Sequence, residues 1–312
     1  MPDSPTIESR RLALKCLAYG GVGTLFTLAG GVLTPTDLAS AGPPAPGAGA
    51  GKPLFVQLSD THIGFKKDAN PDVGATLTQT IELVNGMPEQ PALVIHTGDI
   101  THLSRPAEFD VASTLLATLR VSELHTVPGE HDTTDPGAAE YLGRFGQASG
   151  RRGYYSFDHA GVHFVALINV LDFTPGGLGR LGPEQLEWVT ADLKGRPTST
   201  PIVVFAHMPL WTIYEPWGWG TSDAEPLLKQ LRHFGSVTVL NGHIHQIVQK
   251  VEGNITFHTA RSTAYPQPVV GEAAGPGPLT VPAEQLRRML GLTSATVVGR
   301  KHQLALADAT LA

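Results

Sequence analysis

Five short stretches of this sequence carry aspartate, glutamate and histidine directly after a run of apolar residues. Together they supply three Asp, one Glu and five His, whereas the whole chain holds a single Cys. Carboxylate and imidazole side chains suit zinc, manganese or iron, and one Cys excludes a cysteine-based zinc site. The five stretches therefore predict a metal centre. Their side chains are Asp60, His62, Asp99, Glu130, His131, Asp132, His207, His243 and His245.

The spacing within these stretches gives a physical reason for their grouping. Asp60 and His62 are two residues apart, as are His243 and His245. Residues two apart on an extended segment point the same way, so both members of each pair could face one crevice. A glycine precedes Asp99, and others precede Glu130 and His243. Glycine permits tight turns, and we expect these three to swing the following side chain back over a strand end.

The elements that must position these residues follow from the apolar runs. Five runs are predicted as buried strands, and helical patterns at 76–85, 106–119 and 183–193 separate most of them. Parallel strands of an α/β sheet present their carboxyl ends to one crevice, where ligands bind. The five stretches should therefore meet at one rim. The predicted strands span residues 54–58, 93–96, 124–127, 202–206 and 237–240.

Further strand-like runs extend the predicted fold beyond a simple parallel sheet. They comprise a hairpin of residues 154–157 and 163–168, runs at 247–251 and 255–259, and closing strands at 295–299 and 303–307 after a helix at 283–290. The alternation of strands and helices predicts an α/β fold, and the late strands predict a mixed sheet or a second sheet.

The amino-terminal residues resemble an export signal. Arg10 and Arg11 form the pair of a twin-arginine signal, an apolar run covers 16–33, and Ala39-Ser40-Ala41 offers a cleavage site. We expect a signal peptide at 1–41, a Gly/Pro/Ala linker at 42–52 and one domain at 53–312. The expected partner is the twin-arginine export machinery, with transient membrane contact and a periplasmic or secreted location. A hydrophobic amino-terminal helix or an uncleaved membrane anchor is the alternative.

Composition limits the remaining classes. The chain has 312 residues, with 41% hydrophobic and 16% charged residues, 35 Gly and 25 Pro. This mixture argues against a coiled coil, collagen or a charged disordered chain. The net charge of -6 disfavours a nucleic-acid polymer as partner, because such binding needs an electropositive face.

In this order the five stretches resemble the calcineurin-like metallophosphoesterase superfamily, whose pattern is D-x-H, G-D, G-N-H-[D/E], H and G-H-x-H. The resemblance spans about residues 54–245 and implies two packed mixed β-sheets flanked by helices, a four-layer sandwich. It also implies two divalent or trivalent metal ions, such as Mn, Fe or Zn, with Asp99 bridging them. The first ion would be held by Asp60, His62, Asp99 and His245, and the second by Asp99, Glu130, His207 and His243.

The same resemblance implies hydrolysis of a phosphoester. The expected substrates are phosphodiesters, including nucleotide-like compounds. Two cations about 3.5–4 Å apart would lower the pKa of a bridging water, and the resulting hydroxide would attack in line. His131 would be the general acid for the leaving alcohol, and Asp132 would orient it. A phosphomonoesterase, or a non-catalytic metal-binding or scaffolding protein on this fold, is the alternative.

One sequence position departs from the usual pattern of the superfamily, and two others indicate which branch this chain resembles. The family usually has Asn where this chain has Glu130, so Glu130 either binds metal or turns aside and leaves the second site weak. Purple acid phosphatases have Tyr at the position of His102 and lack the histidine that Asp60-x-His62 supplies. The pattern therefore looks more like the bacterial cyclic-nucleotide and general phosphodiesterase branch.

Several residues around the expected site have predicted positions or roles of their own. We expect His102 on an exposed loop, the alternative being that it approaches the metals, and His96 in the core with hydrogen bonds. Arg261 is a possible phosphate contact, and residues 268–282 form either a lid or a surface loop. Four aromatic residues after His207 either stack against a flat substrate group or pack their own loop onto the domain. They are Trp211, Tyr214, Trp217 and Trp219.

Overall fold

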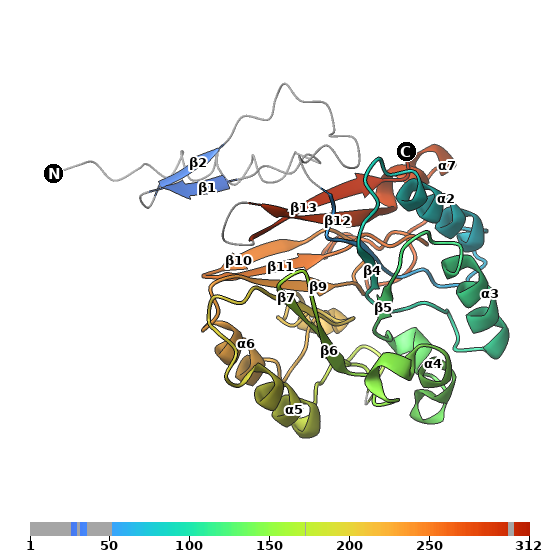
Figure 1. The fold of residues 1–312 in the computed structure, drawn as a ribbon. Helices are drawn as coiled ribbons and strands as arrows, with labels where there is room; N and C mark the ends of the chain where they lie inside the picture. The colour runs from blue at the N-terminus through green and yellow to red at the C-terminus, as the bar shows by residue number, and fades with distance from the viewer. Residues whose placement is uncertain (1–25, 30–31, 36–51, 172, 299–302) are drawn as a thin grey trace. The chain divides into compact units, whose positions relative to one another are not determined.

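The computed structural model describes residues 26–29, 32–35, 52–171, 173–298 and 303–312 (Figure 1). The chain divides into two units, Met1–Pro44 and Ala45–Ala312. In the first unit, strand β1 (Phe26–Ala29) pairs antiparallel with β2 (Val32–Pro35). The paired arginines and the cleavage site lie outside the described residues, so the signal peptide stays a prediction. None of the described helices is long and apolar enough to cross a bilayer.

Two mixed sheets form the body of the second unit. The five-stranded sheet has the order β13-β12-β3-β4-β5, in which β3, β4 and β5 are parallel. Strand β12 runs antiparallel to β3, and β13 runs antiparallel to β12. The strands are β3 (Phe55–Leu58), β4 (Leu93–His96), β5 (Leu124–Thr126), β12 (Gly291–Val298) and β13 (Gln303–Thr310).

The second sheet has six strands in the order β10-β11-β9-β8-β7-β6. Its four inner strands are parallel, and an antiparallel strand closes each edge. The strands are β6 (Tyr155–His159), β7 (Val162–Ala166), β8 (Ile202–Phe205), β9 (Val237–Asn241), β10 (Gln249–Glu252) and β11 (Ile255–Thr259).

The inner faces of the two sheets pack against each other. Phe55 of β3 and Phe164 of β7 meet edge to face, with ring centroids 5.9 Å apart, in a core shared by both sheets. Successive residues of β8 face opposite ways: Val203 joins this inner core, whereas Val204 joins the core on the outer face. Both faces of these strands are buried, which explains why the runs are apolar throughout.

Helices cover the outer faces and complete the predicted sandwich (Figure 1). Helices α2 (Val73–Asn85), α3 (Pro106–Leu116) and α4 (Ala139–Arg144) pack on the five-stranded sheet. Helices α5 (Pro183–Leu193) and α6 (Glu225–Leu231) pack on the six-stranded sheet. The predicted fold of two packed mixed sheets flanked by helices is confirmed.

Local differences from the predicted elements have simple causes. The β6–β7 hairpin turns over Ala160-Gly161, with φ of 48° and 78°, so its loop is shorter than expected. Helices α4 and α6 were not predicted, because six or seven residues give too little periodicity to detect. Helix α7 (Ala283–Met289) precedes β12 as expected. The short 3₁₀ turns are Glu130–Asp132, Pro136–Ala138, Gly146–Ser149 and Glu215–Trp217.

Candidate metal centre

The predicted site residues all follow the carboxyl end of a parallel strand. Asp60 lies two residues after β3, and Asp99 lies three residues after β4. The β5, β8 and β9 strands come from both sheets and lead into the loops that carry Glu130, His207 and His243. Each of these strands pairs with at least one parallel neighbour, which fixes the point where its loop begins.

The backbone of these loops is left-handed at five site residues. Their φ angles are 54° at Asp60, 42° at His62, 54° at Asp99, 71° at His243 and 55° at His245. A non-glycine residue in this region costs about 1–3 kcal/mol and persists only where the surroundings hold it there. The expectation of extended D-x-H and H-x-H segments is therefore wrong, although the side chains still converge.

The three glycines before the site residues matter mainly because they have no side chain, which lets other groups approach their backbone closely. Only Gly98 has a positive φ, at 94°. A Cβ on Gly129 would collide with the Asp99 carboxylate, and one on Gly242 would collide with the Ser59 hydroxyl. The expected role of tight turns therefore holds for Gly98 alone. The other two let neighbouring loops approach closely.

One group of ligand-type atoms gathers at Asp60, His62 and His245, all buried. His245 Nε2 lies 3.3 Å from Asp60 Oδ1 and 3.2 Å from His62 Nε2. The ligand atoms of all three residues lie within 4.8 Å of one another. The two residues of the first stretch are thus joined by one from the last stretch, more than 180 residues away in sequence.

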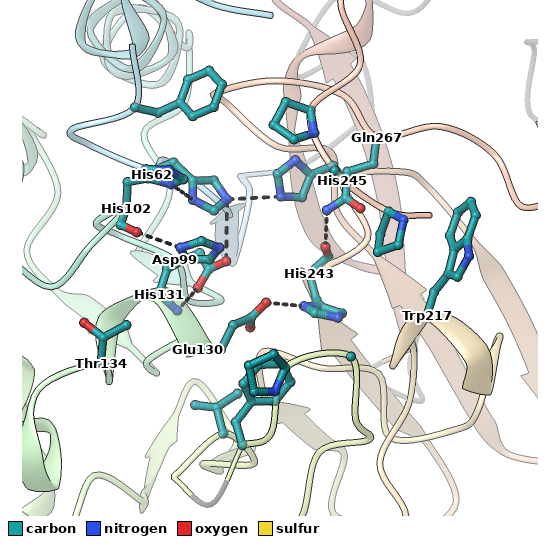
Figure 2. A pocket seen from close by; sticks show the side chains of 18 of the residues that line it. His62, Asp99, His102, Glu130, His131, Thr134, Trp217, His243, His245 and Gln267 are labelled. Atoms are coloured by element: carbon teal, nitrogen blue, oxygen red, sulfur yellow. Dashed lines mark hydrogen bonds and ion pairs between the residues drawn. The ribbon is translucent and has the colours of Figure 1, made fainter. Parts of the chain in front are cut away.

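A second group gathers at Glu130, His207 and His243. Glu130 Oε2 lies 2.9 Å from His207 Nε2. Glu130 Oε1 lies 2.9 Å from His243 Nδ1 (Figure 2). Glu130 therefore points into the group and does not turn aside. Asp99 lies between the groups, with Oδ2 3.5 Å from His62 Nε2 and 3.4 Å from His207 Nε2.

Backbone carbonyls orient the imidazole rings at the site. His207 Nδ1 lies 2.7 Å from the Thr97 carbonyl oxygen, and His245 Nδ1 lies 2.6 Å from that of Tyr265. A carbonyl only accepts, so each Nδ1 carries the proton and donates. Each Nε2 is then free to offer its lone pair to a cation. This arrangement is typical of metal-binding histidines.

Buried atoms without hydrogen bonds fit the same interpretation. Among the described residues, Glu130 Oε2, His207 Nε2 and both ring nitrogens of His243 are buried and lack a hydrogen bond of adequate geometry. A buried polar atom without a partner costs about 1–3 kcal/mol. A cation would satisfy all of these atoms, and the combination of imidazoles and carboxylates suits zinc, manganese or iron. The residues present therefore fit a metal ion.

The charges of the site favour the ionised carboxylates. Burial raises the pKa of Asp60, but the His245 and His207 imidazoles lower it more strongly, to about 2. Burial likewise opposes ionisation of Glu130, and His243 and His207 hold its pKa well below the ordinary value. Burial lowers the pKa of His207, but Asp99 and Glu130 raise it well above its ordinary value. In the metal-free chain, Asp99 and Glu130 therefore favour the protonated form of the His207 imidazole.

His131 lies beside the two groups, on the loop after β5. Its backbone N–H donates to Asp99 Oδ1 at 2.9 Å, and its ring Nδ1 donates to the His102 carbonyl at 2.6 Å. Burial lowers the pKa of His131, but Asp99 and Glu130 raise it more, so that the net shift is upward. The ring is therefore held in place and favours the protonated form.

Asp132 does not orient His131 in the expected way. Its carboxylate accepts hydrogen bonds from the backbone N–H groups of Gly129, Ile100 and Thr101 at 3.0, 2.9 and 2.7 Å, and from the Thr101 hydroxyl at 2.8 Å. The orienting partner of the His131 ring is the His102 carbonyl. This part of the prediction is wrong: Asp132 joins the loop after β5 to the loop after β4.

His102 lies at the site, which was the alternative to the expected exposed loop position. It is half-buried and its ring stacks on His131, with centroids 4.8 Å apart at an angle of 16°. Its Nδ1 lies 3.4 Å from His62 Nδ1. The expected exposed loop position is wrong, because the loop after β4 folds over the His131 ring. His96 is buried and accepts from the Gly98 N–H at 3.2 Å, as expected.

A cavity of about 640 Å³ opens onto both groups. Trp217 and Trp219 line it, whereas Trp211 packs against Phe257, with ring centroids 4.8 Å apart and the rings tilted at 54°. Trp211 therefore packs its own loop onto the domain, whereas Trp217 and Trp219 lie where a substrate group could contact them. Residues 276–278 of the expected lid or surface loop also line the cavity. Arg261 lies elsewhere, with Nη1 bonded to the Arg288 and Met289 carbonyls at 3.3 Å.

Two mixed sheets with imidazole and carboxylate groups gathered at their strand ends form a site suited to metal ions. The family model described as "Calcineurin-like phosphoesterase" matches residues 53–247. The chain belongs to this family and is a metallophosphoesterase, a phosphoric ester hydrolase. The family depends on metal, in agreement with the two groups of ligand-type side chains.

Similar proteins include named phosphodiesterases. The chain is 28% identical to the glycerophosphodiester phosphodiesterase GpdQ of Enterobacter lignolyticus, over 72% of this chain and 82% of that protein. It is 24% identical to a protein of Rhodopseudomonas palustris named a probable cyclic nucleotide phosphodiesterase, over 68% and 78% of the two chains. Among solved structures, a dimetal phosphatase from Danio rerio aligns with a TM-score of 0.60 and 15% identity, covering 84% of this chain and all of that one. This last likeness concerns the fold.

Proposed function

We propose that this protein is a dinuclear metal-dependent phosphodiesterase. The observation that carries the proposal is the position of Asp99, whose Oδ2 lies about equally far from the imidazoles of His62 and His207. One carboxylate between two groups of ligands can serve both. Asp60, His62, Asp99 and His245 would hold one ion, and Asp99, Glu130, His207 and His243 would hold the other. When bound, the two ions would supply charge neutralisation for the phosphoryl group and a water of lowered pKa.

The chain's own residues supply the remaining chemistry. His131 Nδ1 donates to the His102 carbonyl, so Nε2 is the nitrogen left to face substrate. With its raised pKa, His131 favours the imidazolium form and can give the Nε2 proton to the departing alkoxide. Asp132 holds the two loops that carry Asp99 and His131 in register. General acid catalysis contributes about 10²–10⁴-fold to the rate of such a step.

Phosphodiesters are the favoured substrate class. Two similar proteins are named for diester hydrolysis, of glycerophosphodiesters in one and of cyclic nucleotides in the other. The cavity also has lining residues beyond the ligand groups on more than one side, including Thr134 and Trp217. A diester has two substituents to place, whereas a monoester has one.

The assay that tests this proposal uses protein loaded with Mn or Zn. Bis- and mono-p-nitrophenyl phosphate are compared, with the bound metal counted in the same sample. We expect turnover of the diester with two ions bound and a higher kcat/KM than for the monoester. A higher value for the monoester would indicate a phosphomonoesterase. Two bound ions with turnover of neither compound would indicate a non-catalytic metal-binding or scaffolding protein.

We also propose export by the twin-arginine pathway, on the basis of Arg10 and Arg11 and the following apolar run. This pathway carries folded proteins, so the chain could acquire its metals before it crosses the membrane. In a bacterial host, replacement of both arginines by lysine should keep the protein in the cytoplasm. Cell fractionation measures this, and export of the double variant at the rate of the original chain would refute the proposal.

A further inference from the structure

The cavity extends to opposite sides of the ligand groups (Figure 2). His131 and Thr134 lie on one side of Glu130, and Trp217 lies on the other side, beyond His243. The two sides differ in chemistry. His131, Thr134 and the exposed amine of Lys67 are polar, whereas the rings of Trp217 and Trp219 are apolar.

The aromatic side is a small apolar cluster with one edge on the cavity. Trp217 and Trp219 are only 8% and 2% exposed. Their rings meet edge to face with centroids 5.0 Å apart, and both pack with Ile244, which lies between His243 and His245. The little surface that they retain includes their contribution to the cavity wall. The aromatic wall is therefore directly joined to the stretch that carries two proposed ligands.

The loop that carries these rings is held in a defined shape. The Ile213 N–H donates to the Trp219 carbonyl at 2.7 Å, and the Trp219 N–H donates to the Tyr214 carbonyl at 3.1 Å. Gly218, with φ of 70°, lies against the Gly177 carbonyl, where a Cβ would not fit. A wall that is already ordered loses little conformational freedom when a ligand binds.

We propose that the substrate is a phosphodiester of two unlike groups, with a flat aromatic group against Trp217 and a polar alcohol on the side of His131 and Thr134. This inference rests on the proposed phosphodiesterase function. The general acid must lie next to the oxygen that leaves. The alcohol beside His131 is therefore the leaving group, and the aromatic group stays on the phosphate. Water adds across the P–O bond, giving the polar alcohol and an aryl or nucleoside-like monoester.

Diesters with a constant leaving group test this assignment. The substrates are p-nitrophenyl phosphates whose second substituent is methyl, phenyl or 1-naphthyl. We expect kcat/KM to rise along this series, mainly through KM, because aromatic stacking adds binding that is similar in the ground and transition states. In Trp217→Ala, the ratio of kcat/KM for the naphthyl over the methyl ester should fall about tenfold, as expected for loss of one stacking contact.

Two further variants keep the test independent of folding. Trp217→Phe retains a ring and should retain most of the ratio. Trp211→Ala removes the tryptophan that packs against Phe257 outside the cavity and should leave the ratio unchanged. A naphthyl-to-methyl ratio near one in the original protein would overturn the inference, as would an equal loss in Trp211→Ala and Trp217→Ala.

A binding measurement separates this inference from the proposed function. The quenching of tryptophan fluorescence is titrated with 1-naphthyl phosphate and with methyl phosphate on the metal-loaded protein. Tighter binding of the naphthyl compound that is lost in Trp217→Ala supports the aromatic site, even if no ester is turned over. That result without turnover would refute the phosphodiesterase function alone. Turnover with equal binding of both compounds would overturn the aromatic site alone.

Discussion

Asp99 Oδ2 lies 3.5 Å from the Nε2 atom of His62 and 3.4 Å from the Nε2 atom of His207. The two histidines belong to different groups of ligand-type residues and follow strands of different sheets. One carboxylate thus connects the two halves of the sandwich at the rim. This relationship is the basis of our proposal that two metal ions act together.

Replacement of Asp99 should affect both ions at once. In Asp99→Asn we expect bound metal to fall from two ions to fewer than one per chain, and diester turnover to fall at least a hundredfold. The neutral amide lacks the negative charge of the carboxylate, which would help to neutralise both cations. Elemental analysis after dialysis measures the metal. The matched control is Asp68→Asn, on the exposed surface of the β3–α2 loop, which should keep two ions.

Replacement of Glu130 should affect one group of ligands more than the other. Its two oxygens each lie 2.9 Å from a histidine of the second group. In Glu130→Gln we expect about tenfold weaker binding of one ion, with the other retained, because one carboxylate charge is lost at that group. Calorimetric titration with Mn resolves the two steps. Unchanged metal binding and turnover would mean that Glu130 is not a ligand.

The role of His131 predicts a dependence on the leaving group. In His131→Ala, turnover should fall about a hundredfold for a methyl-ester leaving group and much less for p-nitrophenolate, because a poor leaving group needs the proton more. Steady-state rates on the two diesters measure this. Bound metal should remain at the original level. Equal losses on both substrates would count against the general acid.

Metal binding should release protons near neutral pH. Burial lowers the pKa of His207, but Asp99 and Glu130 raise it well above the ordinary value in the metal-free chain. The raised pKa stabilises the metal-free fold below about pH 6.5, and this contribution is lost as pH rises through the raised pKa. A cation must displace that proton, so metal affinity should fall as pH falls. Titration in buffers of different ionisation enthalpy measures the release, and a heat independent of buffer would contradict it.

The fold and most of the site could be predicted because they depend on local signals. Apolar runs that end at Asp, Glu or His residues mark strand ends, and parallel strand ends meet at one rim. This rule alone predicts that His207 and His245 lie near Asp60, although they are far from it in the sequence. The mixed-sheet sandwich itself followed from the resemblance to a family, because the late strands alone left a mixed sheet or a second sheet open.

The remaining features depend on contacts between loops, which no local pattern encodes. His102 was expected on an exposed loop, but that loop folds over His131 and its carbonyl orients the ring. Asp132 was expected to do this, yet three of its four hydrogen bonds go to the loop after β4 and the fourth goes to Gly129 in its own loop. Tyr265 stacks on His62 with ring centroids 4.8 Å apart, although nothing in its sequence context indicates a site residue.

The central claim is that two ions share Asp99, and the positions of the ions test it most directly. A crystal structure of the Mn-loaded protein, with anomalous scattering recorded at the metal edge, locates each ion independently of the protein atoms. We predict two peaks about 3.5–4 Å apart, both in contact with Asp99, and Glu130 in contact with the ion bound by His207 and His243. A single peak, or two peaks of which only one contacts Asp99, would contradict the account.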